Sequence, residues 1–100
     1  MLLSEAILKG SEGRGQCKYT LEDHLQRVCA HGAANIGKSG SSRPHKDRDW
    51  VSLTATICKI CSKYTSGILT HLNDGHDYTF QQIIDYIKKE NLDVELDAAK

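Results

Sequence analysis

The chain of 100 residues is long enough for one domain and too short for two independent hydrophobic cores. Hydrophobic residues make up 39% of it, the mean hydropathy is -0.47, and no apolar run approaches the roughly 20 residues that a membrane span needs. The formal net charge is zero, which leaves no overall electrostatic argument for binding nucleic acid or a membrane.

The first residues lack the pattern of a secretory signal peptide, because Ser4 and Glu5 interrupt the apolar run that starts at Met1. We therefore expect the protein in the cytoplasm. Thiols stay reduced in that compartment, so pairs of Cys residues are expected to bind metal there rather than to form disulfides.

Two helices are predicted in the N-terminal part, residues 2–37. Apolar residues at helical spacing predict a short helix over residues 2–9, which Gly10 ends. A longer helix is predicted to begin at Thr20, a suitable N-cap, and to end near Gly37. Its apolar face consists of Leu21, Leu25, Val28, Cys29 and Ile36. Small residues indicate that another backbone approaches this helix closely: Gly32, Ala33 and Ala34.

A polar loop and a strand are predicted next. Residues 38–49 contain Gly, Ser and the only Pro, and predict a flexible loop with a net charge of +2. Residues 51–57 alternate apolar and polar side chains, which is typical of a half-buried strand. Because this strand leads directly into Cys58, the Cys58–Cys61 turn is expected at the tip of a small hairpin.

The remaining residues predict a short helix, a turn and a longer helix. Thr65 or Ser66 is expected to cap the short helix, which places His71 near its end, and Asn73-Asp74-Gly75 is a turn signal.

A second C-terminal helix is predicted over residues 79–90. Thr79 and Gln82 form a capping box at its start, and its core face contains Phe80, Ile83, Ile84 and Ile87. The tail of residues 91–100 is expected to fray, although its apolar residues alternate in a way that suits pairing: Leu92, Val94 and Leu96.

Four potential metal ligands lie close together in the sequence: Cys58, Cys61, His71 and His76. They form the pattern C-x2-C-x9-H-x4-H. Zn²⁺ favours four such ligands in a tetrahedron, and structural sites are commonly built from paired Cys and paired His. The pattern therefore predicts a structural zinc ion that organises the second half of the chain. The two His can reach one ion only if the residues between them fold the chain back.

Other interpretations of these residues remain open. The two Cys could be ordinary thiols with the His capping local turns, and His76 is the least certain ligand. A redox role for the CxxC would need a thioredoxin-like βαβ context, which the sequence lacks. A catalytic zinc would need an open coordination position, and the H-x-E and HExxH patterns of zinc enzymes are absent. Asp74 and Asp77 flank His76 and are candidates to orient it.

The two remaining Cys are not expected to be ligands. Cys29 is expected to be a buried structural residue, since a nucleophile would need exposure and a partner base. Cys17 is a spare thiol in the connector between the first two helices.

A set of basic and aromatic residues provides a possible contact with nucleic acid: Arg43, Lys46, Arg48, Trp50, Lys59 and Lys63. A lone Trp beside cations is a weak sign of base stacking, and two acidic residues offset the loop cations, which makes a poor phosphate track.

Several blocks of the sequence resemble a group of small phage and prophage proteins of uncharacterised function. These blocks are Leu3-Ser-Glu-Ala-Ile7-x-x-Gly10, Cys29-Ala-x-Gly-Ala33, Cys58-x-x-Cys61, His71-Leu-Asn-Asp-x-His76-x-Tyr-Thr79 and Ile83-x-Asp-Tyr-Ile87. Tyr78 stands where that group usually has Trp, and Lys59 where Pro is common. The resemblance implies that the four metal-ligand candidates act together, and it carries no activity.

Together these observations predict one mostly α domain (α+β) with a zinc-bearing β-hairpin and no enzymatic activity. Its expected function is that of a phage or prophage accessory protein that binds a host protein complex in the host cytoplasm, and inhibition of host defence, as by an anti-CRISPR, is one form this would take. The alternative is a zinc-finger-like regulator that binds nucleic acid.

Overall fold

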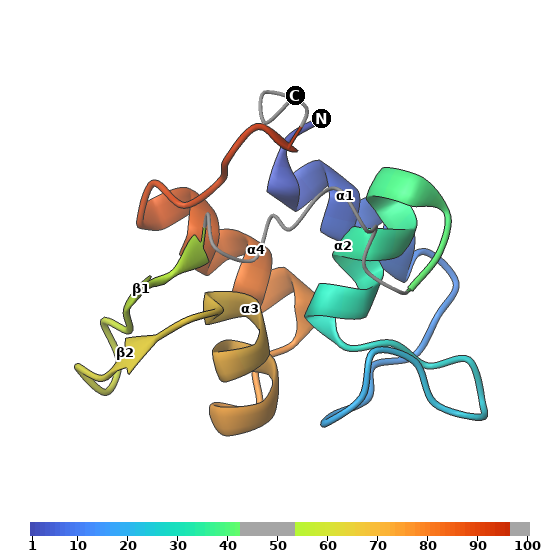
Figure 1. Cartoon of the computed structure of the whole chain (residues 1–100), viewed down its shortest axis with the longest axis horizontal. Coiled ribbons are helices and arrows are strands. Elements are labelled where there is room, and N and C mark those ends of the chain that lie inside the picture. Colours follow the sequence, from blue (N-terminus) through green and yellow to red (C-terminus); the bar gives the residue numbers. More distant parts are fainter. Residues whose placement is uncertain (43–53, 97–100) are drawn as a thin grey trace.

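The structure is a computed structural model of the chain, and it describes residues 1–42 and 54–96. Its helices are α1 (Leu3–Ser11), α2 (Ala30–Ser39), α3 (Ile68–Thr70) and α4 (Phe80–Lys89), and α3 continues directly into a π-helical turn, η2 (His71–Gly75). The strands β1 (Thr56–Ile57) and β2 (Tyr64–Thr65) form one antiparallel hairpin. The fold is mostly helical with a small hairpin at one side (Figure 1), as predicted. Within the described ranges, no helix has both the length and the apolar character that crossing a bilayer requires.

Helices α1 and α2 pack with their backbones nearly in contact. A Cβ atom placed on Gly10 would lie 1.6 Å from the Ala33 carbonyl oxygen, and one on Gly37 would lie 1.9 Å from the Ala6 carbonyl oxygen. Gly32 approaches the loop before α2 equally closely, since a Cβ atom placed on it would lie 2.1 Å from the Leu21 carbonyl oxygen. The close approach that the small residues of α2 predicted is therefore confirmed.

The segment after α4 closes the N-terminal end of α1. Leu3 N donates to Val94 O at 2.9 Å, and Leu96 N donates to Met1 O at 2.9 Å. The Asp93 carboxylate accepts hydrogen bonds from the amide and the hydroxyl of Ser4, both at 2.7 Å. These contacts satisfy amides in the first turn of α1, which have no partner within the helix. The expected fraying of residues 91–100 is therefore wrong as far as Leu96, where the pairing that the alternating apolar residues suit is observed instead.

Helix α4 begins as the sequence predicts. Thr79 Oγ1 accepts from Gln82 N, and the Gln82 side chain accepts from Thr79 N, which together form the capping box. The predicted core residues Ile83, Ile84 and Ile87 are buried, and Phe80 is half-buried. The larger core also includes Leu3, Ile7, Val28, Ile68, Leu69, Leu72, Tyr86 and Leu96.

The prediction of a helix starting at Thr20 is wrong. Residues 20–28 form a loop, in which the Asp23 carboxylate accepts from the amides of Leu25 and Arg27. Gln26 adopts a left-handed backbone with φ 62°, which ends any helical path. An Asp that bonds to amides two and four residues ahead offers the backbone an alternative to the helix. Leu25 is consequently 61% exposed rather than part of an apolar face.

The helix α2 begins at Ala30, and its N-cap, Cys29, lies nine residues after the predicted N-cap Thr20. The sulfur of Cys29 accepts a hydrogen bond from Gly32 N at 3.3 Å. The thiol is buried, which confirms the structural role expected for it.

The predicted strand before Cys58 and the predicted N-cap of the helix before His71 both differ from the structure. Of the described residues 54–57 of the predicted strand 51–57, Thr56 and Ile57 are paired in β1. Residues 51–53 and most of the loop 38–49 lie outside the described residues. Neither Thr65 nor Ser66 is the N-cap of α3, which is Gly67 without a side-chain bond. Thr65 Oγ1 instead accepts from Gly67 N at 3.2 Å and orients the chain just before the helix.

The substitution Gly37→Ala should lower the free energy of unfolding by about 1–3 kcal/mol, because the added methyl group has no room against Ala6. In an open helix the same change would stabilise by about 0.5–1 kcal/mol. Urea unfolding monitored by circular dichroism measures the difference.

Gly75→Ala is the matched control, since its Cβ would meet no atom closer than 3.9 Å. An unchanged or higher stability of Gly37→Ala would contradict the packing of α1 on α2.

Candidate metal centre

The CxxC segment forms the turn of the hairpin, as predicted. Cys58 N donates to Lys63 O at 2.8 Å, and Ser62 N donates to Cys58 O at 2.8 Å. Ser62 adopts a left-handed backbone with φ 64°, which lets the chain reverse directly after the second Cys. The turn directs both sulfur atoms inward, with Cys58 buried and Cys61 half-buried.

The two His come from the helical segment that follows the hairpin. His71 is the first residue of η2, and His76 directly follows its last residue. In an α-helix, residues five apart are separated by about 140° around the axis, because each residue turns about 100°. A π-helix bonds residues five apart and so places them nearly above one another. The wider π-helical turn therefore brings both His to the same side of the segment. It occupies the position at which the sequence predicted a turn, Asn73-Asp74-Gly75.

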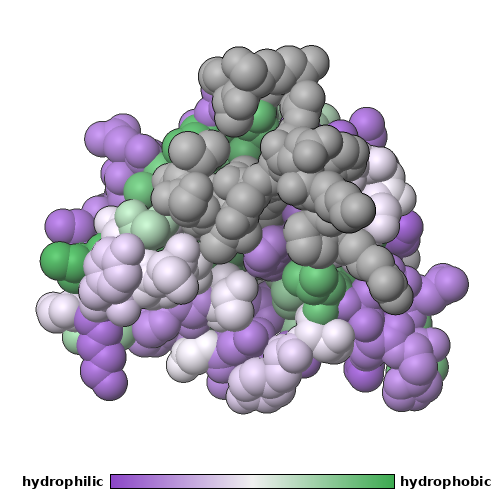
Figure 2. Space-filling view, in the orientation of Figure 1, coloured by the Kyte–Doolittle hydropathy of each residue, from purple (hydrophilic) through white to green (hydrophobic). Residues whose placement is uncertain are grey.

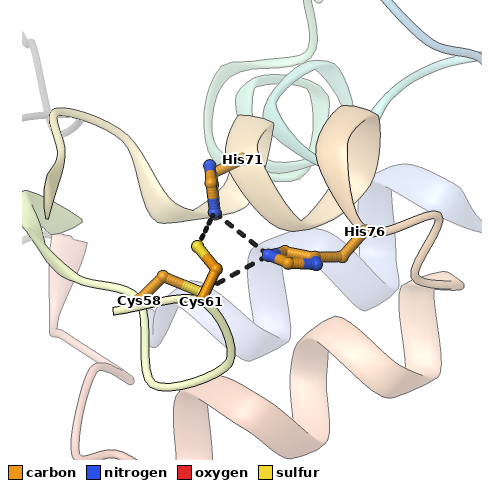
Figure 3. Close-up of side chains that lie close together, drawn as sticks. All are labelled: Cys58, Cys61, His71 and His76. Atoms are coloured by element: carbon orange, nitrogen blue, oxygen red, sulfur yellow. Dashed lines mark hydrogen bonds between the residues drawn. The ribbon is translucent and has the colours of Figure 1, made fainter. Parts of the chain in front are cut away.

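The four side chains converge on one point (Figure 3). His71 Nε2 and His76 Nε2 are 3.1 Å apart, Cys61 Sγ lies 3.3 Å from His71 Nε2, and Cys58 Sγ lies 3.6 Å from His76 Nε2. All four potential ligand atoms lie within 4.8 Å of one another. Tetrahedral zinc, with bonds of about 2.3 Å to sulfur and about 2.0–2.1 Å to nitrogen, places its ligand atoms about 3.3–3.8 Å apart. The three printed separations are close to those of a tetrahedral site, and these residues could hold a metal ion.

Electrostatics in the cluster favour the ligand forms of both residue types. Burial alone raises the pKa of the Cys58 thiol, but the amides of Cys61 and Ile60, the Cys61 thiol and the Tyr86 hydroxyl together hold its pKa below the usual value. Burial lowers the pKa of His71, and the nearby His76 and Lys63 lower it further. A metal binds thiolate sulfur and neutral imidazole, so both shifts act in the direction that metal binding needs.

Tyr86 connects the hairpin turn to α4. Its hydroxyl accepts a hydrogen bond from Lys59 N at 3.0 Å and also lies against the Cys58 sulfur. Burial raises the pKa of this hydroxyl, which keeps it protonated and able to donate. Tyr86 is a site residue that the sequence did not predict, although its place directly before Ile87 in the amphipathic helix could have indicated it.

Asn73 is a second residue that sequence reasoning missed. It lies within η2 and is fully buried. Its amide oxygen accepts from Ala30 N at 3.0 Å and from Gln16 Nε2 at 2.7 Å, and its nitrogen donates to Cys17 O at 2.9 Å. These partners lie 43 to 57 residues away in the chain. The residue between the two His ligands therefore holds the N-terminal loop and the start of α2.

The acidic residues flanking His76 have other partners. The Asp74 carboxylate accepts from Asn73 Nδ2 at 2.8 Å and from Tyr19 N at 3.2 Å. The Asp77 carboxylate pairs with Lys18. The role of orienting His76, for which both were candidates, is not supported by their observed contacts in the described part of the chain.

Cys17 lies apart from the cluster. Its sulfur contacts Arg27 O at 3.2 Å and Thr20 O at 3.6 Å, and burial raises the pKa of its thiol. In the part of the chain that the structure describes, the only Cys and His residues grouped with metal-binding geometry are the predicted four.

Of the six residues predicted to contact nucleic acid, the structure describes two. Lys59 and Lys63 are exposed on the hairpin turn. Arg43, Lys46, Arg48 and Trp50 lie outside the described residues, so that interpretation stays a prediction.

Comparison of the chain with protein-family models, with curated proteins and with solved structures found no match. The geometry of the four side chains is therefore the basis for a functional conclusion.

Replacing Cys58 by Ser should reduce the bound metal from about one ion per chain to a small fraction, and should lower the free energy of unfolding by several kcal/mol. The reason is that metal affinity in such a site is also folding free energy. Elemental analysis of the purified protein and thermal unfolding with and without chelator measure both effects.

Cys17→Ser is the control, because Cys17 lies outside the cluster, and it should keep the metal. A metal-free wild-type protein whose unfolding does not respond to chelator or added metal would contradict the site.

Replacing Asn73 by Ala should destabilise the protein by about 2–4 kcal/mol, since it leaves several buried polar groups without partners. Hydrogen exchange should show the largest loss of protection at Ala30, far from the substitution in sequence. Gln81→Ala, an exposed amide on α4, should change stability by less than about 0.5 kcal/mol. Equal effects of the two substitutions would argue against the role of Asn73.

Proposed function

We propose that Cys58, Cys61, His71 and His76 hold one structural zinc ion, and that the protein is a non-enzymatic module that binds a host macromolecular complex. The observation that carries the proposal is the set of four ligand atoms within 4.8 Å of one another, supplied by two Cys and two His.

The donor set favours zinc over other abundant ions. Thiolate sulfur and imidazole nitrogen suit Zn²⁺, whereas Mg²⁺ and Ca²⁺ prefer oxygen ligands. The separations of 3.1–3.6 Å between neighbouring ligand atoms fit a tetrahedron. The Asp74 and Asp77 carboxylates contact groups outside the cluster. Zn²⁺ bound by two thiolates and two neutral imidazoles would therefore give a site with no net charge.

Four protein ligands support a structural rather than a catalytic role. A catalytic zinc usually has three protein ligands and keeps one position for water or substrate. Here the protein itself supplies the fourth group. The closed set supports a metal that fixes the hairpin against η2 and α4, and a function that depends on the surface so formed.

The resemblance of the HLND block to small phage and prophage proteins supports the host setting. Such a protein would act by occupying a surface of a host complex, for example as an inhibitor of host defence such as an anti-CRISPR. The exposed apolar side chains of the hairpin, Ile57, Ile60 and Tyr64, support a binding role, because a domain that needed them only for folding would bury them.

The metal and its coordination are tested by replacing it with Co²⁺. The Co²⁺-loaded protein should show the intense visible absorption of a tetrahedral site and a sulfur-to-metal charge-transfer band, and Zn²⁺ should displace the cobalt completely. His76→Ala should weaken and shift the visible bands by opening one position. Weak octahedral bands in the wild type would contradict the closed site.

The binding role is tested by immobilising the zinc-loaded chain in lysate of a bacterial host and comparing it with Cys58→Ser. A host complex retained by the wild type and lost in the variant is the expected result. Expression in a strain with active CRISPR–Cas interference should in addition raise the plating of a targeted phage. Salt-dependent binding to random DNA or RNA, with no retained protein, would replace this proposal by the nucleic-acid alternative.

A further inference from the structure

Among the residues that the structure describes, several exposed apolar side chains lie close together on the hairpin that carries Cys58 and Cys61. Large hydrophobic side chains exposed in the described residues are Leu2, Leu8, Tyr19, Leu25, Ile57, Ile60 and Tyr64. Three of these seven lie within the eight residues 57–64, with exposed fractions of 53%, 45% and 70% in chain order. Figure 2 shows hydrophobic surface at the edge of the molecule where the hairpin lies.

The three side chains share a fixed scaffold. Ile57 and Tyr64 are directly paired across the two strands, so their side chains lie on the same face of the hairpin. Ile60 lies at the turn between Cys58 and Cys61. The turn is held by the bonds from Cys58 N to Lys63 O and from Lys59 N to the Tyr86 hydroxyl. A rigid apolar surface loses little conformational entropy when a partner binds it.

The charged residues within the hairpin have one sign. Lys59 lies next to Ile60 and Lys63 next to Tyr64 in the chain, both lysines are exposed, and residues 54–73 contain no Asp or Glu. An exposed apolar surface with adjacent cations complements a partner that has an apolar recess and acidic groups.

We propose that Ile57, Ile60 and Tyr64, flanked by Lys59 and Lys63, form the docking surface for an acidic, apolar protein surface. This inference rests on the proposed function, and it names the part of the chain that binds and the chemistry of the partner.

Two other occupants fit this surface less well. In a symmetric dimer formed through the hairpin, Lys59 and Lys63 of both copies would lie close together and repel. A nucleic acid would contact only two cations on this surface, and the protein as a whole has no net charge. In addition, two of the three apolar side chains are Ile, which does not stack on bases as aromatic rings do. An acidic protein surface satisfies both the lysines and the isoleucines.

The test uses the zinc-loaded full chain labelled with ¹⁵N and three probes: a synthetic peptide that alternates Glu with Leu and Phe, the same peptide with every Glu replaced by Lys, and an oligothymidine. Amide shifts confined to residues 57–64 on adding the acidic peptide are expected. The Lys peptide should bind at least about tenfold more weakly because of its like charge. The double variant I60S/Y64S should weaken binding of the acidic peptide by about tenfold or more.

Tyr19→Ser is the matched control. Tyr19 is even more exposed, at 80%, and lies in the N-terminal loop outside the hairpin, so its removal should leave binding of the peptide unchanged. Retained zinc in I60S/Y64S, measured by elemental analysis, shows that this variant keeps its metal centre.

Several results would overturn the inference: equal binding of both peptides, shifts outside the hairpin, preferential binding of the oligothymidine, self-association of the free chain through the hairpin, or no binding of any probe. These results are distinct from failure of the proposed function. A host complex that I60S/Y64S retains as well as the wild type would leave the proposed function standing and remove this surface from it.

Discussion

The position of His76 relative to His71 is the constraint on which the centre depends. Two ligands five residues apart cannot share an ion on a regular α-helix, and the chain meets this requirement with the π-helical turn η2. A π-helix is rare and commonly occurs at functional sites. Here its effect is specific, since it places two imidazole nitrogens 3.1 Å apart and in reach of both sulfurs of the hairpin.

The same turn connects the two halves of the protein. Leu72 and Asn73, between the two His, are buried, and the Asn73 amide bonds to groups of the N-terminal loop and of α2. A metal ion that fixes the ends of η2 would also fix the direction of this amide. Asn73 is one of several links between this region and the N-terminal loop, since Gln16 also bonds to Tyr78 O and Phe80 N, and Tyr19 N donates to the Asp74 carboxylate.

Local patterns predicted the parts of the fold that local chemistry controls. The capping box of α4 depends on residues three apart in sequence, the hairpin turn on the CxxC spacing, and the close packing of α2 on a run of small residues. The four clustered side chains were predictable for the same reason, because all of them lie in one short segment.

The features that could not be predicted depend on partners distant in sequence or on competing local bonds. The apolar spacing of Leu21, Leu25 and Val28 favours a helix, but the bonds from the Asp23 carboxylate and the pairing of Val28 with Gln16 hold a loop instead. Asn73 has the composition of a turn residue, and only its partners at Gln16, Cys17 and Ala30 make it part of the core. No periodicity within residues 71–76 distinguishes a turn from a π-helix.

The long separation between Asn73 and its partners has a consequence for synthesis of the chain on the ribosome. Ala30 is added 43 residues before Asn73, so the nascent N-terminal segment has its Ala30 amide and Cys17 carbonyl bonded only to water until the C-terminal half emerges. The ligands, by contrast, emerge as one continuous stretch from Cys58 to His76. The bonds of Asn73 to Cys17 and Ala30 can therefore form only after residues 58–76, with all four candidate ligands, have been synthesised.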